Sequence, residues 1–117
     1  MARYAVHQLP YPENTPEWFR EKRRDISFED ALPNVADLLM YNLVAVIEAE
    51  DLHDAFEIGN VGPESKINRI GPMRSLSVGD CLLDMDDHRM WIVRNVGFHE
   101  LKLVEGDDYD DAMETGS

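Results

Sequence analysis

The sequence has a single cysteine, Cys81, and no long apolar run. One cysteine excludes an internal disulfide, and a cysteine inside an apolar stretch is typical of a core residue in a reducing compartment, which predicts a cytoplasmic protein. The longest apolar segment, residues 41–49, has the length of a β-strand, whereas a membrane-spanning helix needs about 20 apolar residues. The start of the chain, MARYAVHQLP, has no apolar block of the kind found in a signal peptide. We therefore expect neither a leader nor a membrane span.

Motifs for metal binding and catalysis are also missing. The four histidines form no HxxxH, HExxH or HxH unit, so no local spacing directs two imidazoles to one ion. The acidic run Asp84, Asp86 and Asp87 lacks the central glycine and the later glutamate of a calcium loop. The glycines are isolated at turns, and the serines have no GxSxG context. We predict no catalytic residue, no metal site and no cofactor.

Basic residues are scarce. The chain has 24 acidic and 11 basic residues, a net charge of −13, and six of the acids lie in residues 105–117, which contain no Lys or Arg. Such a charge repels duplex phosphates, so direct nucleic-acid binding is not expected, and it favours a protein partner with a basic surface. The same acidity also fits simple solubility, and composition leaves both interpretations open.

Apolar periodicity and end signals predict a mixture of strands and short helices. The expected strands cover residues 3–9, 41–48, 81–85 and 89–96, with another after Gly97. Two helices are expected early in the chain, one over residues 16–24 and one that begins at a Ser27–Asp30 capping box. A third begins at Asn34, with Val35, Leu38 and Leu39 facing the sheet, and a fourth runs from Asp51 to Gly59. A short helical turn is expected after Gly62-Pro63, with Ile67 and Ile70 inward.

These elements predict one α+β domain over residues 1–104, followed by a flexible acidic tail over residues 105–117. We expect an antiparallel-rich sheet of four to five strands with the short helices packed on one face. The basic residues Arg20, Lys22, Arg23 and Arg24 gather at the end of the first expected helix, either as a solvated helix end or as a docking patch.

Residues 51–101 carry a pattern of motifs that is similar to a known family. Its most distinctive parts are Arg74–Asp80, RSLSVGD, and Gly97–Leu101, GFHEL. The pattern resembles the YodL-like small domain of Gram-positive bacteria and of phage and plasmid proteins. The resemblance implies a mobile-element context and an interaction with host machinery, and it transfers no catalytic residue. The family usually carries Ser where Gly79 stands, and Arg74 is expected either to pair with Asp80 and fix the turn or to carry a functional charge.

The sequence thus predicts a non-catalytic, phage- or mobile-element-derived inhibitor that mimics nucleic acid and blocks a basic surface of a host defence or nucleic-acid-handling complex. The alternatives are a self-associating structural or assembly subunit and a small enzyme that uses scattered side chains such as His53, Glu57 and His99. The oligomeric state is left open. The partner-binding candidates lie in two acidic segments and comprise Glu50, Asp51, Asp54, Glu57, Asp84, Asp86 and Asp87.

Overall fold

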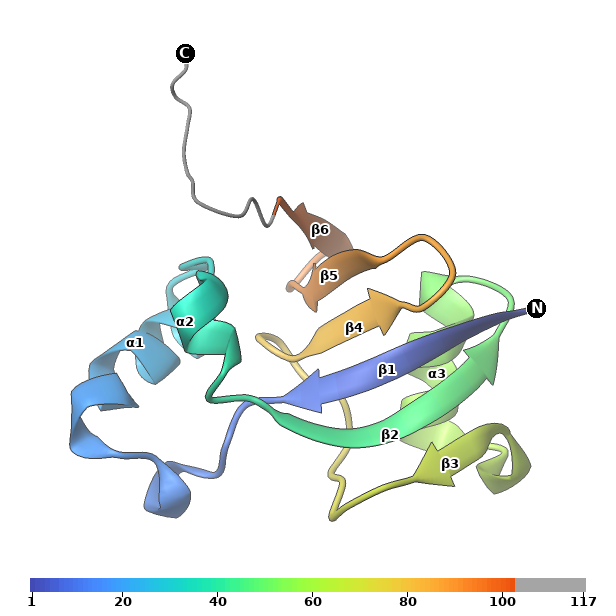
Figure 1. Ribbon diagram of the computed structural model, residues 1–117, viewed down its shortest axis with the longest axis horizontal. Helices are drawn as coiled ribbons and strands as arrows, with labels where there is room; N and C mark the ends of the chain where they lie inside the picture. Colours follow the sequence, from blue (N-terminus) through green and yellow to red (C-terminus); the bar gives the residue numbers. More distant parts are fainter. Residues whose placement is uncertain (103–117) are drawn as a thin grey trace, which may run out of the picture.

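The computed structural model of the protein describes residues 1–102 (Figure 1). The predicted acidic tail, residues 105–117, lies outside the described residues. Within residues 1–102, six strands form one sheet in the order β3-β2-β1-β4-β5-β6, and every neighbouring pair is antiparallel. The strands are β1 (Ala2–Gln8), β2 (Asn42–Ala49), β3 (Ile67–Arg69), β4 (Cys81–Asp84), β5 (Arg89–Val93) and β6 (Phe98–Leu101). The expected α+β class with an antiparallel sheet is confirmed.

Strand β3 raises the number of strands above the expected four to five. The segment after Gly62-Pro63 forms only a short 3-10 turn, η2 (Glu64–Lys66), and then pairs with β2, with Ile67 opposite Ile47. The expected short helical turn is present and Ile67 packs against the core, but the expected inward position of Ile70 is wrong, since 55% of Ile70 is exposed. The local proline and glutamate signal starts the turn, but hydrogen bonding to the edge of β2 makes the next residues a strand.

Helix α3 (Leu52–Val61) covers one face of the sheet. Its start was predicted correctly, because the Asp51 side chain accepts a hydrogen bond from the backbone N–H of Asp54 at 2.9 Å. Its end was not: Gly59 lies inside the helix, and a Cβ there would sit 2.7 Å from Leu76 Cδ1. Glycine at this position therefore allows a close approach between the helix and the segment that precedes β4.

The first helices lie beyond the end of β1 (Figure 1). After a 3-10 turn, η1 (Pro12–Asn14), helix α1 runs over Glu17–Phe28. Ser27 is therefore inside α1, and the expected capping box at Ser27–Asp30 is wrong. The backbone N–H groups of Glu29 and Ala31 both donate to the carbonyl of Asp25, and Asp30 has a φ of 60°. This is a helix C-terminus of the kind in which a left-handed residue closes the last turn.

Helix α2 (Val35–Leu38) is only one turn long. Its expected cap is confirmed, because Asn34 and Asp37 exchange side chain-to-backbone hydrogen bonds at 2.8 and 2.9 Å. The expected sheet-facing side is wrong in part: Leu38 packs against the core, but 53% of Val35 and 81% of Leu39 are exposed. One turn of helix is too short to lay three apolar side chains on the sheet.

The core has two parts. The part beneath α3 joins strands β1, β2 and β4 through residues that include Val6, Ile47 and Leu82. The other part joins α1 to β4–β6 and contains Leu9, Phe19, Ile26, Tyr41, Cys81, Met90, Ile92 and Leu101. Successive residues of a strand point to opposite faces, so Cys81 and Leu82 serve different parts of the core. Both faces of β4 are thus covered.

Candidate acidic interaction surface

Two acidic segments meet at the start of β1. The register places Ala2 opposite Ala49 at the end of β2, and Tyr4 opposite Asp84 at the end of β4. The backbone N–H of Met85 also donates to the carbonyl of Arg3 at 3.0 Å. The β2–α3 junction and the β4–β5 turn therefore lie at the same end of the sheet (Figure 1). We call this surface the acidic end; it comprises Glu50, Asp51, Asp54, Asp84, Asp86 and Asp87.

The pKa of Tyr4 is affected by the carboxylates of both segments. Its side chain is buried in the core beneath α3. Burial raises the pKa of the Tyr4 phenol, and the negative charges of Asp84, Asp51, Asp87 and Asp86 raise that pKa further, in this order. The phenol is therefore protonated at neutral pH. Carboxylates from both segments act on one hydroxyl, so their negative potentials overlap at the acidic end.

Three carboxylates of the acidic end hold local structure. Asp51 caps α3, and Asp54 accepts a hydrogen bond from the backbone N–H of Glu50 at 2.9 Å. Asp84 Oδ1 accepts from the backbone N–H groups of Asp86 and Asp87 at 2.9 and 3.2 Å. These bonds close the helix start and the hairpin turn. Asp51, Asp54 and Asp84 thus position the acidic end as well as contributing charge.

The other predicted partner-binding residues form no side-chain hydrogen bond or ion pair in the described part of the chain. Glu50, Asp86 and Asp87 are exposed, as is Glu57 further along α3. Within residues 1–102, none of these four carboxylates accepts a side-chain hydrogen bond or joins an ion pair. They are therefore the carboxylates with which a partner can pair at no cost to the fold.

Arg74 and Asp80 form a structural network, which confirms the interpretation that their pairing fixes the turn. Asp80 is fully buried and accepts hydrogen bonds from Leu9 N, Gln8 Nε2, Ser77 N and Arg74 Nη2 at 3.1–3.2 Å. Burial raises the pKa of the Asp80 carboxyl, whereas Arg74 and these hydrogen bonds act against that rise. The RSLSVGD motif therefore attaches the segment before β4 to the end of β1.

Gly79 lies in a backbone conformation that favours glycine. Its φ is +99°, and a Cβ there would lie 2.9 Å from Leu9 Cδ1. Its carbonyl accepts a hydrogen bond from the Tyr41 hydroxyl at 2.7 Å, which fixes the backbone in this conformation. A residue with a side chain would be strained in this region of backbone space.

Cys81 is a residue of the core. Cys81 is buried, as expected of a core residue, and burial raises the pKa of its thiol to about 12. Because the thiolate is the reactive form, this cysteine is protonated and unreactive at neutral pH.

The histidines considered for the enzyme alternative are not brought together. His53 on α3 packs edge-on against Phe98, with ring centroids 5.2 Å apart. His99 follows Phe98 in β6, so its side chain points to the opposite face of the sheet. His53 and Glu57 share α3, but no hydrogen bond joins their side chains in the part of the chain described. Among residues 1–102, no group of three His, Cys, Asp or Glu side chains could hold a metal ion.

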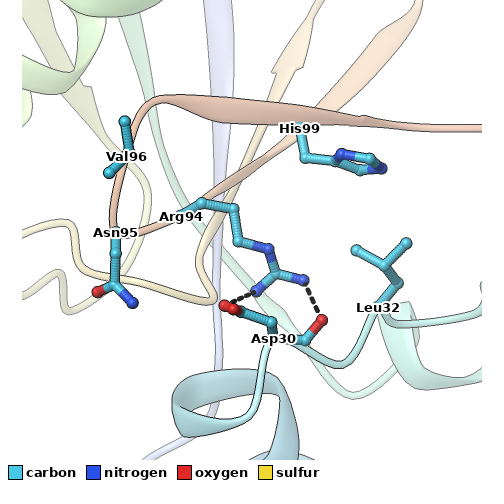
Figure 2. A pocket seen from close by; sticks show the side chains of 6 residues that line it. All are labelled: Asp30, Leu32, Arg94, Asn95, Val96 and His99. Carbon is cyan, nitrogen blue, oxygen red and sulfur yellow. Dashed lines mark hydrogen bonds and ion pairs between the residues drawn. The ribbon is translucent and has the colours of Figure 1, made fainter.

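His99 lines a shallow cleft of about 440 Å³ between the end of α1 and the β5–β6 turn (Figure 2). Arg94 extends across it and donates to the carbonyls of Asp30 and Ala31 at 3.0 and 2.9 Å, while Leu32 forms part of the wall. The guanidinium also pairs with the Asp30 carboxylate at 3.8 Å. Arg94 is therefore a structural link between the two elements.

Comparisons with protein-family models, with curated proteins and with solved structures give no match to this chain. The YodL-like resemblance accordingly stays a prediction. No helix within residues 1–102 has both the length and the apolar character needed to cross a bilayer.

Proposed function

We propose that this protein is a non-catalytic interaction protein of phage or mobile-element origin that acts in the host cytoplasm. Its acidic end binds a basic surface of a host defence or nucleic-acid-handling complex and blocks access of nucleic acid to that surface. The observation that carries the proposal is the convergence of two acidic segments around Tyr4. Four of the candidate carboxylates, Glu50, Glu57, Asp86 and Asp87, remain available to pair with a partner.

The physical basis is electrostatic complementarity. A net charge of −13 attracts a basic partner at long range, and the rigid acidic end sets the orientation in which the two surfaces meet. Lys and Arg side chains that normally neutralise phosphates would pair with the exposed carboxylates instead. Binding of this kind weakens as salt screens the charges, with a Debye length of about 10 Å at 0.1 M salt.

Support for binding rather than catalysis comes from the positions of the reactive groups. Cys81 is buried with a raised thiol pKa, and His53 and His99 point to opposite faces of the sheet. An enzyme that used these groups would need them in one accessible pocket. The exposed carboxylates, by contrast, are already placed for contact with another macromolecule.

The test uses two triple variants with the same change in net charge. One neutralises the acidic end by Glu50→Gln, Asp86→Asn and Asp87→Asn. The control neutralises exposed positions on and after α1 by Glu17→Gln, Glu21→Gln and Glu29→Gln. Immobilised wild type and variants are incubated with bacterial cytosolic extract, and captured proteins are eluted with a salt gradient or with duplex DNA.

We expect wild type and the control to retain the same basic protein, and DNA to displace it. The acidic-end variant should lose that protein at clearly lower salt, because three carboxylates no longer pair with it. Equal elution of both triple variants would show that only net charge matters. Retention that neither salt nor DNA affects would refute the proposal.

An assembly subunit is a second candidate function, because apolar side chains are exposed around α2. Phe28, Val35 and Leu39 are 75%, 53% and 81% exposed. Burial of these side chains between copies would stabilise an oligomer. Sedimentation of the purified chain over a range of concentrations distinguishes the two functions, since the blocking function requires no self-association.

A further inference from the structure

A basic surface lies at the opposite end of β1 from the acidic end. Here two arginines from distant parts of the chain are held by consecutive backbone carbonyls. Arg23 on α1 donates through Nε to the carbonyl of Pro10 at 2.6 Å, and Arg74 donates through Nη1 to the carbonyl of Leu9 at 3.0 Å. Each bond fixes a guanidinium beside the segment just after β1, so the two cations are neighbours.

Arg74 forms an ion pair, whereas Arg23 forms none within residues 1–102. Arg74 pairs with Asp80 at 3.2 Å, but Asp80 is buried and shared with three other donors. Arg23 joins no ion pair with any residue from 1 to 102, and only its Nε donates to a protein group there. Burial lowers the pKa of Arg23 and the nearby charge of Arg74 lowers it further, whereas the charges of Asp80 and Glu13 act against this shift.

Tyr11 completes the surface. The Arg74 guanidinium carbon lies 5.2 Å from the centroid of the Tyr11 ring, a cation–π contact that holds the side chain over the ring. Tyr11 remains 38% exposed, so a ligand can reach the ring from solvent. Two fixed guanidinium groups and one accessible aromatic ring therefore share this end of the sheet.

We propose that Arg23, Arg74 and Tyr11 form a binding site for a phosphate monoester group. The Nη nitrogens of Arg23 are the available donors, and a guanidinium presents them in a planar fork that matches two phosphate oxygens. Two neighbouring cations match the two negative charges that a phosphate monoester carries near neutral pH. The site lies at the other end of β1 from the acidic end, so a test of phosphate binding does not depend on the blocking function.

The test measures binding of phenyl phosphate to the full-length protein by calorimetry, in a phosphate-free buffer of low ionic strength. Phenyl sulfate is the matched probe with the same ring and one negative charge. The variants are Arg23→Gln and Arg23→Lys, and the control is Arg24→Gln, which removes the same charge from the next residue of α1. Circular dichroism verifies that each variant is folded.

We expect saturable binding of phenyl phosphate and weaker binding of phenyl sulfate. Arg23→Gln should lower the affinity by at least about tenfold, as expected when charge-assisted hydrogen bonds are lost, and Arg24→Gln by less than about threefold. Arg23→Lys keeps the charge but loses the fork, so it should also bind more weakly than wild type, and it provides the test if Arg23→Gln does not fold.

Three results would overturn the proposal. One is the lack of saturable binding by wild type, and another is an equal loss of affinity in Arg23→Gln and Arg24→Gln, which would indicate a general charge effect. The third is tighter binding of a short duplex DNA without terminal phosphates than of phenyl phosphate, because it would assign this surface to the nucleic-acid backbone instead. An amide shift at Tyr11 in an NMR titration would locate a positive result.

Discussion

Asp80 and Asp86 show how differently single carboxylates serve this protein. Asp80 is fully buried and accepts from four donors, so removing its carboxyl group would leave the backbone N–H groups of Leu9 and Ser77 without this acceptor. Asp86 is exposed, and its carboxylate has no partner in the described chain. The net charge of −13 thus combines groups that hold the fold with groups that face solvent.

His7 makes stability depend on pH. It is partly buried in β1, and this burial lowers the pKa of its imidazole below the ordinary value of 6.5. As the pH falls, the unfolded chain binds a proton before the folded chain does, so stability that is present above the unfolded pKa is lost. We expect the free energy of unfolding to decrease between about pH 7.5 and pH 5.5, and His7→Phe to remove part of this decrease.

Urea unfolding of wild type and His7→Phe at a series of pH values measures this effect. The difference in free energy of unfolding between the two proteins should change in favour of the variant as the pH falls. If the two pH profiles run parallel, His7 does not contribute to the pH dependence.

Among the elements, α1 depends on a side chain from the other end of the chain. Arg94 comes directly after β5, yet it donates to the carbonyls of Asp30 and Ala31 just after α1, and it is only 12% exposed. Arg94→Ala would leave carbonyls at the end of α1 without donors and open the cleft of Figure 2. We expect a loss of about 2–3 kcal/mol in the free energy of unfolding, as for hydrogen bonds to a charged donor.

Arg69→Ala is the matched control, since Arg69 pairs with Glu64 at the surface. Chemical denaturation should show a much smaller loss for the control, because exposed ion pairs contribute little. Equal losses in the two variants would mean that Arg94 does not hold α1.

Local signals were sufficient for some elements. The caps at Asn34 and Asp51 depend on residues three positions away, so the sequence predicted where α2 and α3 begin. Features that depend on distant partners were not predicted. β3 requires the edge of β2, and the close packing of Leu76 against Gly59 joins segments that lie apart in the sequence. The sequence around β3 and around Gly59 indicates neither contact.

The difference between local signals and distant contacts also applies to the acidic end and to the arginine pair. The seven acidic candidates could be named from composition and position, but the convergence of six of them at the acidic end results from the register of β1 with β2 and β4. The bonds of Asp84 to the backbone of Asp86 and Asp87 are local to the β4–β5 turn. The Arg23–Arg74 pair was not predicted, because the two residues lie far apart in the sequence and no local pattern joins them. The basic cluster on α1 was the available signal, and only the fold shows that Arg74 joins it.

For the whole molecule, the sheet separates opposite charges along β1. The acidic end lies at its start, and the arginine pair lies just past its finish. Residues 105–117 carry six acids and few apolar residues. We therefore expect truncation of this segment to change the charge of the protein more than its stability.

A chain that ends at Val104 should fold with a change in Tm of less than about 2 °C, since the acidic segment that is removed has few apolar side chains to bury. Its net charge of −7 instead of −13 should slow association with a basic partner at low salt, and the difference should disappear at high salt. Differential scanning calorimetry and surface plasmon resonance measure the two quantities. A large fall in Tm would show that residues 105–117 belong to the domain.

The position of β1 has a consequence for biosynthesis. β1 leaves the ribosome before β2 and well before β4, yet it lies between them in the sheet, and its register with β4 extends to Asp84. A nascent chain that has released β1 and β2 therefore carries one edge of β1 unpaired until β4 has been translated. During that interval the growing chain exposes hydrogen-bonding groups that any extended peptide could engage. Pairing of β1 with β4 therefore has to wait for the synthesis of all the residues between Gln8 and Cys81.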